Sequence, residues 1–213
     1  MRQRAVKNLE TIIGENQSYA AANPKQQRGH WSEVFPNPDR PLWLEIGSGK
    51  GQFAVQTALA NPDINFIACE GLDNVYVRIL QKAGELQLTN LIVICERIDD
   101  VREYFAEGEL SRLYLNFCDP WPKARHEKRR LTYGKKLLQY REVLKPGSVL
   151  QFKTDNDALF EYSLTQFDEL DFEYEFTRDL YGSEFADGNI PTEYEEKFSS
   201  QGKNINFARL MIK

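Results

Sequence analysis

A short apolar run that leads through a glycine turn into a helix limits how this chain can fold more than any other feature. Leu42–Ile46 is the apolar run, the turn is Gly47-Ser48-Gly49-Lys50-Gly51, and an amphipathic stretch covers residues 52–59. Glycines let the backbone approach a ligand without a Cβ in the way, and the following helix start offers free N–H groups. A strand, a glycine turn and a helix in this order predict a nucleoside-binding site.

Three kinds of ligand compete for such a turn. A phosphate-binding P-loop needs its first glycine where Leu44 stands, and Ser or Thr rather than glycine after Lys50. A dinucleotide fingerprint needs a third glycine where Gln52 stands, which weakens that interpretation without excluding it. An S-adenosylmethionine site needs an acidic residue at the strand end, and Glu45 lies two residues before Gly47. A carboxylate there also opposes a pyrophosphate, because two anions repel in a partly dry cleft.

A second acidic residue follows the next apolar run. Residues 64–69 form that run, and Glu70 follows it, 19 residues after Gly51. Taken alone, Glu70 would be interpreted as an ordinary surface carboxylate. In a chain with a glycine turn after the preceding strand, it is placed to bind both hydroxyls of a ribose. We therefore predict that the cofactor-binding residues include Glu45, Gly47, Gly49 and Glu70.

Apolar runs and helical periodicities alternate along residues 42–167. Further strands are predicted at 91–95, 113–117 and 149–152, and helices at 75–86, 133–144 and 159–167. This alternation predicts an α/β fold with a mainly parallel sheet covered by helices on both faces. Residues 172–176 and 204–212 alternate polar and apolar, which predicts an antiparallel pair at one sheet edge. Thr192, with Glu195 three residues later, predicts a helix that begins with a capping box.

A loop at residues 116–123, Asn-Phe-Cys-Asp-Pro-Trp-Pro-Lys, combines a carboxylate with an indole and runs into the cationic residues 124–130. A carboxylate can accept hydrogen bonds from a nucleobase, an indole can stack on one, and Lys and Arg can neutralise phosphates. The indole of Trp121 either stacks on a base or folds back over the sheet edge. This loop, Glu70 and residues 153–155 all follow predicted strands, and open α/β sheets bind ligands at that edge.

The composition is that of an ordinary globular protein, and its charge is unevenly distributed. The chain has 213 residues, of which 41% are apolar and 28% charged, and a net charge of −5. Residues 120–153 hold ten Lys and Arg against two Glu, a net of +8, whereas residues 155–196 hold fourteen Asp and Glu against one Arg, a net of −13. Because the local field decides binding, the basic segment suits a nucleic acid despite the negative total.

Length and residue usage predict a single domain, with residues 1–40 as an N-terminal arm or loosely docked helix and 41–213 as the core. No apolar run reaches the roughly 20 residues of a membrane span, and residues 1–4 begin no secretion signal, so we expect a cytoplasmic protein. Three cysteines and two histidines rule out a disulfide framework and argue against a metal site.

Five motifs between residues 43 and 198 point to one family. They are Glu45-Ile-Gly-Ser-Gly-Lys-Gly, Asp119-Pro-Trp-Pro-Lys123, Arg125-His-Glu-Lys-Arg-Arg-Leu-Thr132, Phe152-Lys-Thr-Asp155 and Thr192-Glu-Tyr-Glu195. With these motifs the chain closely resembles the bacterial tRNA (guanine-N7)-methyltransferases. The resemblance implies a Rossmann-like class I methyltransferase fold with a seven-stranded sheet and S-adenosyl-L-methionine as cofactor. It also implies methylation of N7 of guanine 46 in the variable loop of tRNA.

The resemblance also implies roles for individual residues. Asp119 would be the catalytic residue and would touch the cofactor together with Glu45 and Glu70. The substrate would be contacted by Lys123, Asp155, Thr192, Glu193, Tyr194 and Glu195. The chain departs from the family where an Asp usually lies near the adenine, because Arg97 stands there. Either Asp99 or a backbone group would then hold the adenine amino group, or the cofactor would bind more weakly.

Two other functions remain possible at this point: a non-catalytic RNA-binding protein of the same fold, or a methyltransferase that acts on an exocyclic amine of a base. A nicotinamide-dependent oxidoreductase fits least, given the glycine spacing. The sequence leaves open whether the protein is a monomer or a homodimer.

Overall fold

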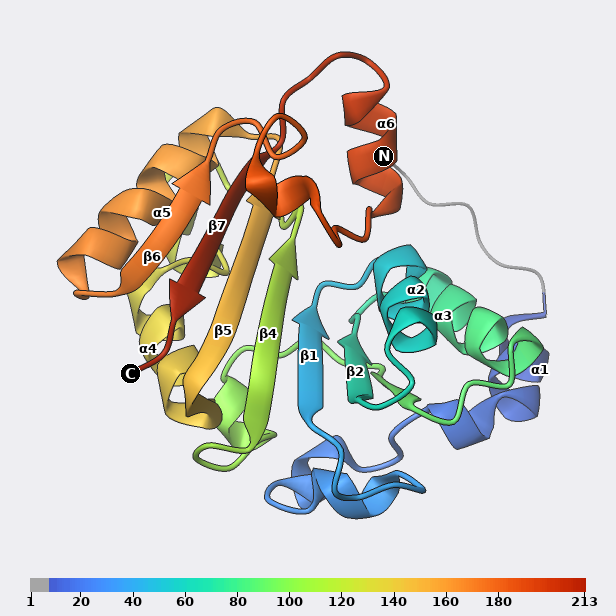
Figure 1. Cartoon of the computed structure of the whole chain (residues 1–213). Coiled ribbons are helices and arrows are strands. Elements are labelled where there is room, and N and C mark those ends of the chain that lie inside the picture. The colour runs from blue at the N-terminus through green and yellow to red at the C-terminus, as the bar shows by residue number, and fades with distance from the viewer. Residues whose placement is uncertain (1–7) are drawn as a thin grey trace.

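A seven-stranded sheet forms the centre of the protein (Figure 1). The structure is a computed structural model that describes residues 8–213. The strands are β1 (Leu42–Ile46), β2 (Asn65–Cys69), β3 (Leu91–Ile94), β4 (Leu110–Asn116), β5 (Leu144–Thr154), β6 (Glu173–Thr177) and β7 (Asn206–Met211). Their order is β3-β2-β1-β4-β5-β7-β6, and β7 runs opposite to the other six strands. The predicted α/β class, the parallel sheet and its antiparallel C-terminal pair are confirmed.

Helices cover the sheet on both faces. They are α1 (Leu9–Glu15), α2 (Gln52–Ala60), α3 (Asp73–Glu85), α4 (Gly134–Val143), α5 (Asp157–Glu169) and α6 (Glu193–Ser199). Strand β2 shows why both faces are needed: Phe66 and Ala68 pack in a cluster with α2 and α3, while Ile67 and Cys69 face the other cluster. A strand that is apolar on both sides is stable only between two layers.

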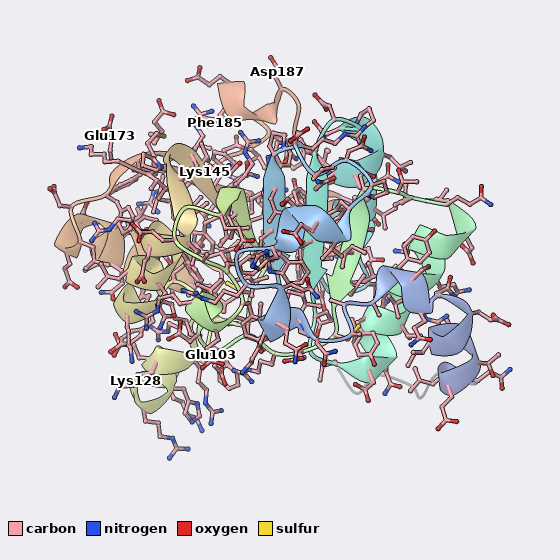
Figure 2. All side chains as sticks on the ribbon, turned by 90° about the horizontal axis from the view of Figure 1, so that it is seen from below. Glu103, Lys128, Lys145, Glu173, Phe185 and Asp187 are labelled. Atoms are coloured by element: carbon pink, nitrogen blue, oxygen red, sulfur yellow. The ribbon has the colours of Figure 1, made fainter. Side chains whose placement is uncertain are left out.

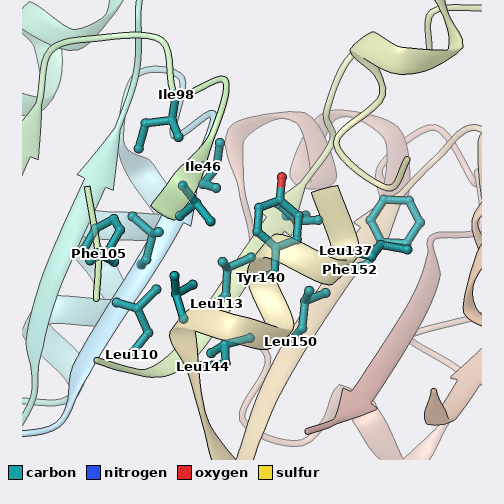
Figure 3. Close-up of a cluster of buried hydrophobic side chains, with 14 of the residues drawn as sticks. Ile46, Ile98, Phe105, Leu110, Leu113, Leu137, Tyr140, Leu144, Leu150 and Phe152 are labelled. Atoms are coloured by element: carbon teal, nitrogen blue, oxygen red, sulfur yellow. The ribbon is translucent and has the colours of Figure 1, made fainter. Parts of the chain in front are cut away.

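The larger core lies between the sheet and helices α4 and α5. Figure 3 shows part of it, where Leu137 and Tyr140 of α4 lie near Leu113, Leu150 and Phe152 of the central strands. These side chains are at most 2% exposed. Burial of this kind contributes roughly 25 cal/mol per Å² of apolar surface, which makes this layer a main source of stability.

The segment before β1 is more firmly attached than a loosely docked arm. Trp31 is fully buried, stacks on Phe105 and donates from Nε1 to the Tyr104 carbonyl at 2.8 Å. Ala20 forms a parallel bridge with Val93 of β3. From residue 8 onward the structure therefore differs from the predicted arm. Residues 1–7 lie outside the described part of the chain.

Strands β4 and β5 begin earlier than the sequence predicts. Strand β5 continues directly from α4 and passes through Pro146 and Gly147, ahead of the strand predicted at 149–152. Gly147 maintains the pairing because its N–H donates to the Ile212 carbonyl at 2.7 Å. The predicted capping box of α6 is confirmed. Within residues 8–213, the helices are all too short or too polar to span a membrane.

The helix that follows the glycine turn needs a glycine at its N-cap for two reasons. Gly51 has a φ of 77°, and a Cβ added there would lie 2.8 Å from the Ile79 side chain of α3. Gly147 has a similar φ of 79° with no atom within 4 Å of an added Cβ. Gly147→Ala should lower the free energy of unfolding by about 1–2 kcal/mol, the cost of a left-handed alanine. Gly51→Ala should cost about 1–3 kcal/mol more, because it also overpacks the α2–α3 contact.

Urea unfolding of the two variants and the wild type tests this difference. Equal losses of stability would show that the close approach of α2 to α3 does not require the glycine.

Candidate active site at the carboxyl edge of the sheet

The parallel strands bring the predicted site segments to one edge. Strands β1, β2, β4 and β5 all run in the same direction, and the register pairs Glu45 with Tyr114 and Asn116 with Lys153. The glycine turn, Glu70 and the loop that carries Asp119 each follow one of these strands. This is the edge at which open α/β sheets bind ligands.

The glycine turn is shaped for close approach. Gly47 and Gly49 have φ values of 83° and 56°, in the left-handed region, and an added Cβ at either would meet no other atom within 4 Å. The N–H groups of Gly47 and Ser48 both donate to the Cys69 carbonyl, at 2.8 and 2.9 Å. These bonds hold the turn against the end of β2 and leave an open surface without side chains, where a ligand can lie.

Glu45 is the most unusual residue of this edge. Its side chain is 1% exposed, and Oε1 accepts a hydrogen bond from Asn116 Nδ2 at 2.8 Å. Oε2 of Glu45 and Oδ1 of Asn116 are buried and have no partner among residues 8–213. Burial raises the pKa of Glu45 to about 7, although the Asn116 hydrogen bond and the charge of Lys153 oppose the rise. Two buried acceptors without donors favour a ligand that brings N–H groups and positive charge.

Glu70 links the first two loops of the edge. Its Oε2 accepts from the Gly49 N–H at 3.0 Å, and its Oε1 accepts from the Leu72 N–H at 3.1 Å. Burial raises the pKa of Glu70, and the negative charge of Asp119 adds to the rise. Glu70 in turn acts on Glu45 in the same direction. The carboxylates of Glu45, Glu70 and Asp119 therefore influence one another across this edge.

The loop after β4 is held in a strained conformation. Phe117 and Trp121 have φ values of 49° and 41°, which non-glycine residues rarely adopt. The Trp121 carbonyl accepts from Arg130 at 3.1 and 3.3 Å, and the Arg129 guanidinium lies 4.8 Å from the centre of the indole. The indole therefore lies against the basic residues that follow it, and its stacking on a base or over the sheet edge stays a prediction.

Basic side chains follow directly after this loop. Residues 124–129 form a 3₁₀ helix whose Lys, Arg and His side chains are mostly exposed. Figure 2 shows that the segment with Lys128 projects from the body of the protein, with nitrogen-tipped side chains around it. Lys123, at the start of this segment, and Asp119 are both exposed. A cationic surface thus lies beside the acidic edge.

The segment predicted to contact substrate is only partly open. Thr192 caps α6, and Glu195 is fully buried, with Oε2 2.6 Å from Lys153 Nζ. Tyr194 is 55% exposed and stacks at 6.5 Å on Phe117 of the Asp119 loop. The substrate contacts proposed for this segment stay predictions.

Three further residues of the predicted site have polar partners. Glu193 pairs with Lys82 at 3.3 Å, and Asp155 pairs with Lys203 at 2.9 Å. Arg97 lies 3.5 Å from Asp99, and both side chains are exposed. An added Cβ at Gly71, next to Glu70, would come within 3.0 Å of Arg97, so Arg97 does lie beside the ribose-binding carboxylate that the sequence predicts.

Two residues of this edge, Asn116 and Lys153, are absent from the sequence-predicted site. Each follows a mainly apolar stretch near the carboxyl end of its strand, residues 113–115 and 149–152, on the same sheet face as Glu45. A polar residue within an apolar strand is the signal that could have identified them. Among residues 8–213, no group of His, Cys, Asp and Glu is arranged to hold a metal ion.

The raised pKa of Glu45 makes stability depend on pH. The folded protein holds the proton of the Glu45 carboxyl group more tightly than the unfolded chain does. The protonated Glu45 therefore contributes its full stabilisation below pH 4.5, and this stabilisation is lost as pH rises through about 7. Glutamine does not ionise, so Glu45→Gln does not lose this stabilisation at high pH. The free energy of unfolding of the variant, relative to that of the ligand-free wild type, should therefore increase from pH 4.5 to pH 8 by at most about 3 kcal/mol. Urea unfolding at both pH values measures the change, with the exposed Glu107 changed to Gln as control. A stability difference that is the same at both pH values would contradict it.

Comparisons with known proteins agree with this geometry. The chain matches a family described as "Putative methyltransferase" over residues 39–208. It is 48% identical over 194 residues to a tRNA (guanine-N(7)-)-methyltransferase of Bacillus cytotoxicus, covering 91% of this chain and 88% of the relative. It is 45% identical over 206 residues to one of Lacticaseibacillus casei, covering 96% of each.

Solved structures show the same fold at lower sequence similarity. The 16S rRNA methyltransferase KamB has a TM-score of 0.60 and 14% identity, over 81% of this chain and 88% of that one. That likeness concerns the fold alone, whereas the relatives above match in sequence over most of their length. The chain belongs to the family of bacterial tRNA (guanine-N7)-methyltransferases.

Proposed function

We propose that this protein transfers the methyl group of S-adenosyl-L-methionine to N7 of guanine 46 in the variable loop of tRNA. The observation that carries the proposal is the pair of buried acceptors without donors, Glu45 Oε2 and Asn116 Oδ1, on the same edge as Asp119 and the basic segment 123–130. The family relationship supports the reaction and the substrate.

The residues of this edge fit the cofactor. Glu45 and Asn116 would receive the ammonium group of its methionine part, because an ammonium has three N–H donors and a positive charge. Glu70 would accept from the ribose hydroxyls, and Gly47 and Gly49 leave room for the ligand beside the backbone. When bound, the cofactor supplies an electrophilic methyl group. Asp119, whose charge already acts on Glu70, would lie beside it.

Asp119 acts by position and charge rather than as a general base. Guanine N7 carries an in-plane lone pair and no proton, so the nucleophile needs no deprotonation. Holding the reactants in line can lower the activation free energy by roughly 7–11 kcal/mol. The Asp119 carboxylate orients the guanine, and its negative charge stabilises the positive charge that develops on the purine.

The basic segment would hold the RNA next to this site. Exposed Lys and Arg side chains at residues 123–130 neutralise phosphates, and Lys123, Asp155 and the segment 192–195 remain the proposed substrate contacts. A cytoplasmic location agrees with a tRNA substrate. The oligomeric state, monomer or homodimer, does not enter the proposal.

Labelled cofactor and unmodified tRNA test the function. Because mild alkali opens the imidazole ring of N7-methylguanine and aniline then cleaves the RNA chain at that nucleotide, this treatment maps the product, and we expect cleavage at position 46. A tRNA with adenine at position 46 is the matched control and should not be labelled. Label in an alkali-stable product would instead support methylation of an exocyclic amine, and absence of label would support an RNA-binding protein without catalysis.

Removing the Asp119 carboxylate should affect turnover without affecting folding. Asp119→Ala should lower kcat by at least about 100-fold, a loss typical for a group that stabilises developing charge. The melting temperature should stay close to that of the wild type, because the side chain is exposed. Single-turnover kinetics and calorimetry measure the two quantities. Glu107→Gln, an exposed change before the start of β4, is the control, and near-normal turnover of Asp119→Ala would remove this residue from the mechanism.

A further inference from the structure

A buried ammonium group lies between the two halves of the proposed site. Lys153 is the second-last residue of strand β5, and its side chain is 0% exposed. Its Nζ donates to Glu195 Oε2 at 2.6 Å, to Asn189 Oδ1 at 3.1 Å and to the Ile190 carbonyl at 3.0 Å. All three donors are therefore used, and every acceptor belongs to the segment 189–195.

The partner carboxylate is equally well enclosed. Glu195 Oε1 accepts from Tyr181 Oη at 3.0 Å and from Asn189 Nδ2 at 2.6 Å, while the Glu195 N–H donates to the capping hydroxyl of Thr192 at 3.0 Å. The Lys153–Glu195 pair thus fastens the start of α6 and the preceding loop to the end of the sheet. Tyr194, next to Glu195, lies against Phe117 of the Asp119 loop.

Lys153 also faces the carboxylate on the cofactor side. It pairs in register with Asn116, and Asn116 donates to Glu45, so the three side chains form a row across β5, β4 and β1 on one face. The positive charge of Lys153 opposes the rise in the pKa of Glu45, while the carboxylate of Glu70 adds to it. One ammonium therefore serves two buried carboxylates, Glu45 and Glu195.

A pair of this kind is not explained by stability alone. Removing two charges from water costs several kcal/mol per ion, and apolar residues of the same size often stabilise a protein as well or better. Burial lowers the pKa of Lys153, and the carboxylates of Glu195 and Glu45 work against this. The ring of Phe53, 5.1 Å from Nζ, is its other close neighbour.

We propose that Lys153 is a positioning residue for both substrates: through Glu195 it places the segment 189–195, and through its charge it keeps the Glu45 carboxylate available to the cofactor. This role rests on the proposed function, because it assigns Glu45 to the cofactor and the start of α6 to the tRNA. A lysine that only held the fold together would have no specific effect on the titration of Glu45.

The test measures cofactor affinity by calorimetry between pH 5.5 and 9, together with KM for tRNA. In the wild type, affinity should rise with pH through the titration of Glu45, because only the carboxylate attracts a cation. Lys153→Met should raise the pH at which the cofactor affinity is half-maximal, the midpoint, by at least about one pH unit, because Glu45 loses a nearby opposite charge. The same variant should raise KM for tRNA about tenfold, equivalent to about 1.4 kcal/mol.

Two further variants separate the two roles. Glu195→Gln should raise KM for tRNA in the same way. The midpoint of its pH-dependent cofactor affinity should stay the same or move downward, because the charge of Lys153 is then balanced by Glu45 alone. Lys82→Met removes another lysine that contacts α6, through Glu193 at 3.3 Å, and should leave the midpoint where it is. An unchanged midpoint in Lys153→Met, or equal upward shifts in Lys153→Met and Glu195→Gln, would overturn the proposal.

Circular dichroism first establishes that each variant is folded. If Lys153→Met does not fold, Lys153→Arg takes its place, because arginine retains the charge but has a different shape. The proposal then requires a wild-type midpoint in the pH dependence of cofactor affinity, together with a raised KM for tRNA. A raised midpoint in Lys153→Arg would overturn it. A wild type that binds no cofactor, or makes no N7-methylguanine, would instead refute the proposed function. A wild type that does both, while Lys153→Met keeps its midpoint and KM, refutes only the role of Lys153.

Discussion

The parallel pairing of β1 between β2 and β4 determines the arrangement of the site. Since all three strands run in one direction, each loop that follows them begins at the same edge. Glu70 repels Glu45, and Asp119 repels Glu70, and this repulsion opposes folding in the absence of a ligand. The repulsion is reduced by the N–H groups that cap Glu70, by the amide of Asn116 and by the ammonium of Lys153. The negative charges that would attract a cationic ligand at this edge thus also reduce the stability of the ligand-free protein.

Local patterns were enough to predict the elements of the fold. The strand at 42–46, the glycine turn and the capping box of α6 each involve residues within a few positions of one another, so periodicity and spacing reveal them. The carboxylates at the strand ends were predicted for the same reason, since they follow apolar runs directly. The family motifs added the expected role of Asp119, which no local pattern contains.

Contacts between distant segments could not be predicted in this way. Asn116 and Glu45 are 71 residues apart, and Lys153 and Glu195 are 42 apart, so their pairing depends on the strand order and on the path of the loop before α6. Burial of Trp31 likewise depends on Phe105, far along the chain. The contact of the Trp121 indole with Arg129 was not predicted either, because it is made only in the folded loop.

The bridge between Ala20 and Val93 has a consequence for behaviour at high concentration. Strand β3 ends the sheet on one side, and an uncovered outer strand is a template on which a second chain can extend the sheet. The Ala21 N–H uses the Val93 carbonyl at 2.9 Å, so part of this template is occupied by the chain itself. On the opposite side, β6 carries glutamates at 173 and 175, which pair with Lys213 and Arg209. One border of the sheet is thereby partly covered by the chain itself, whereas ion-paired side chains line the other.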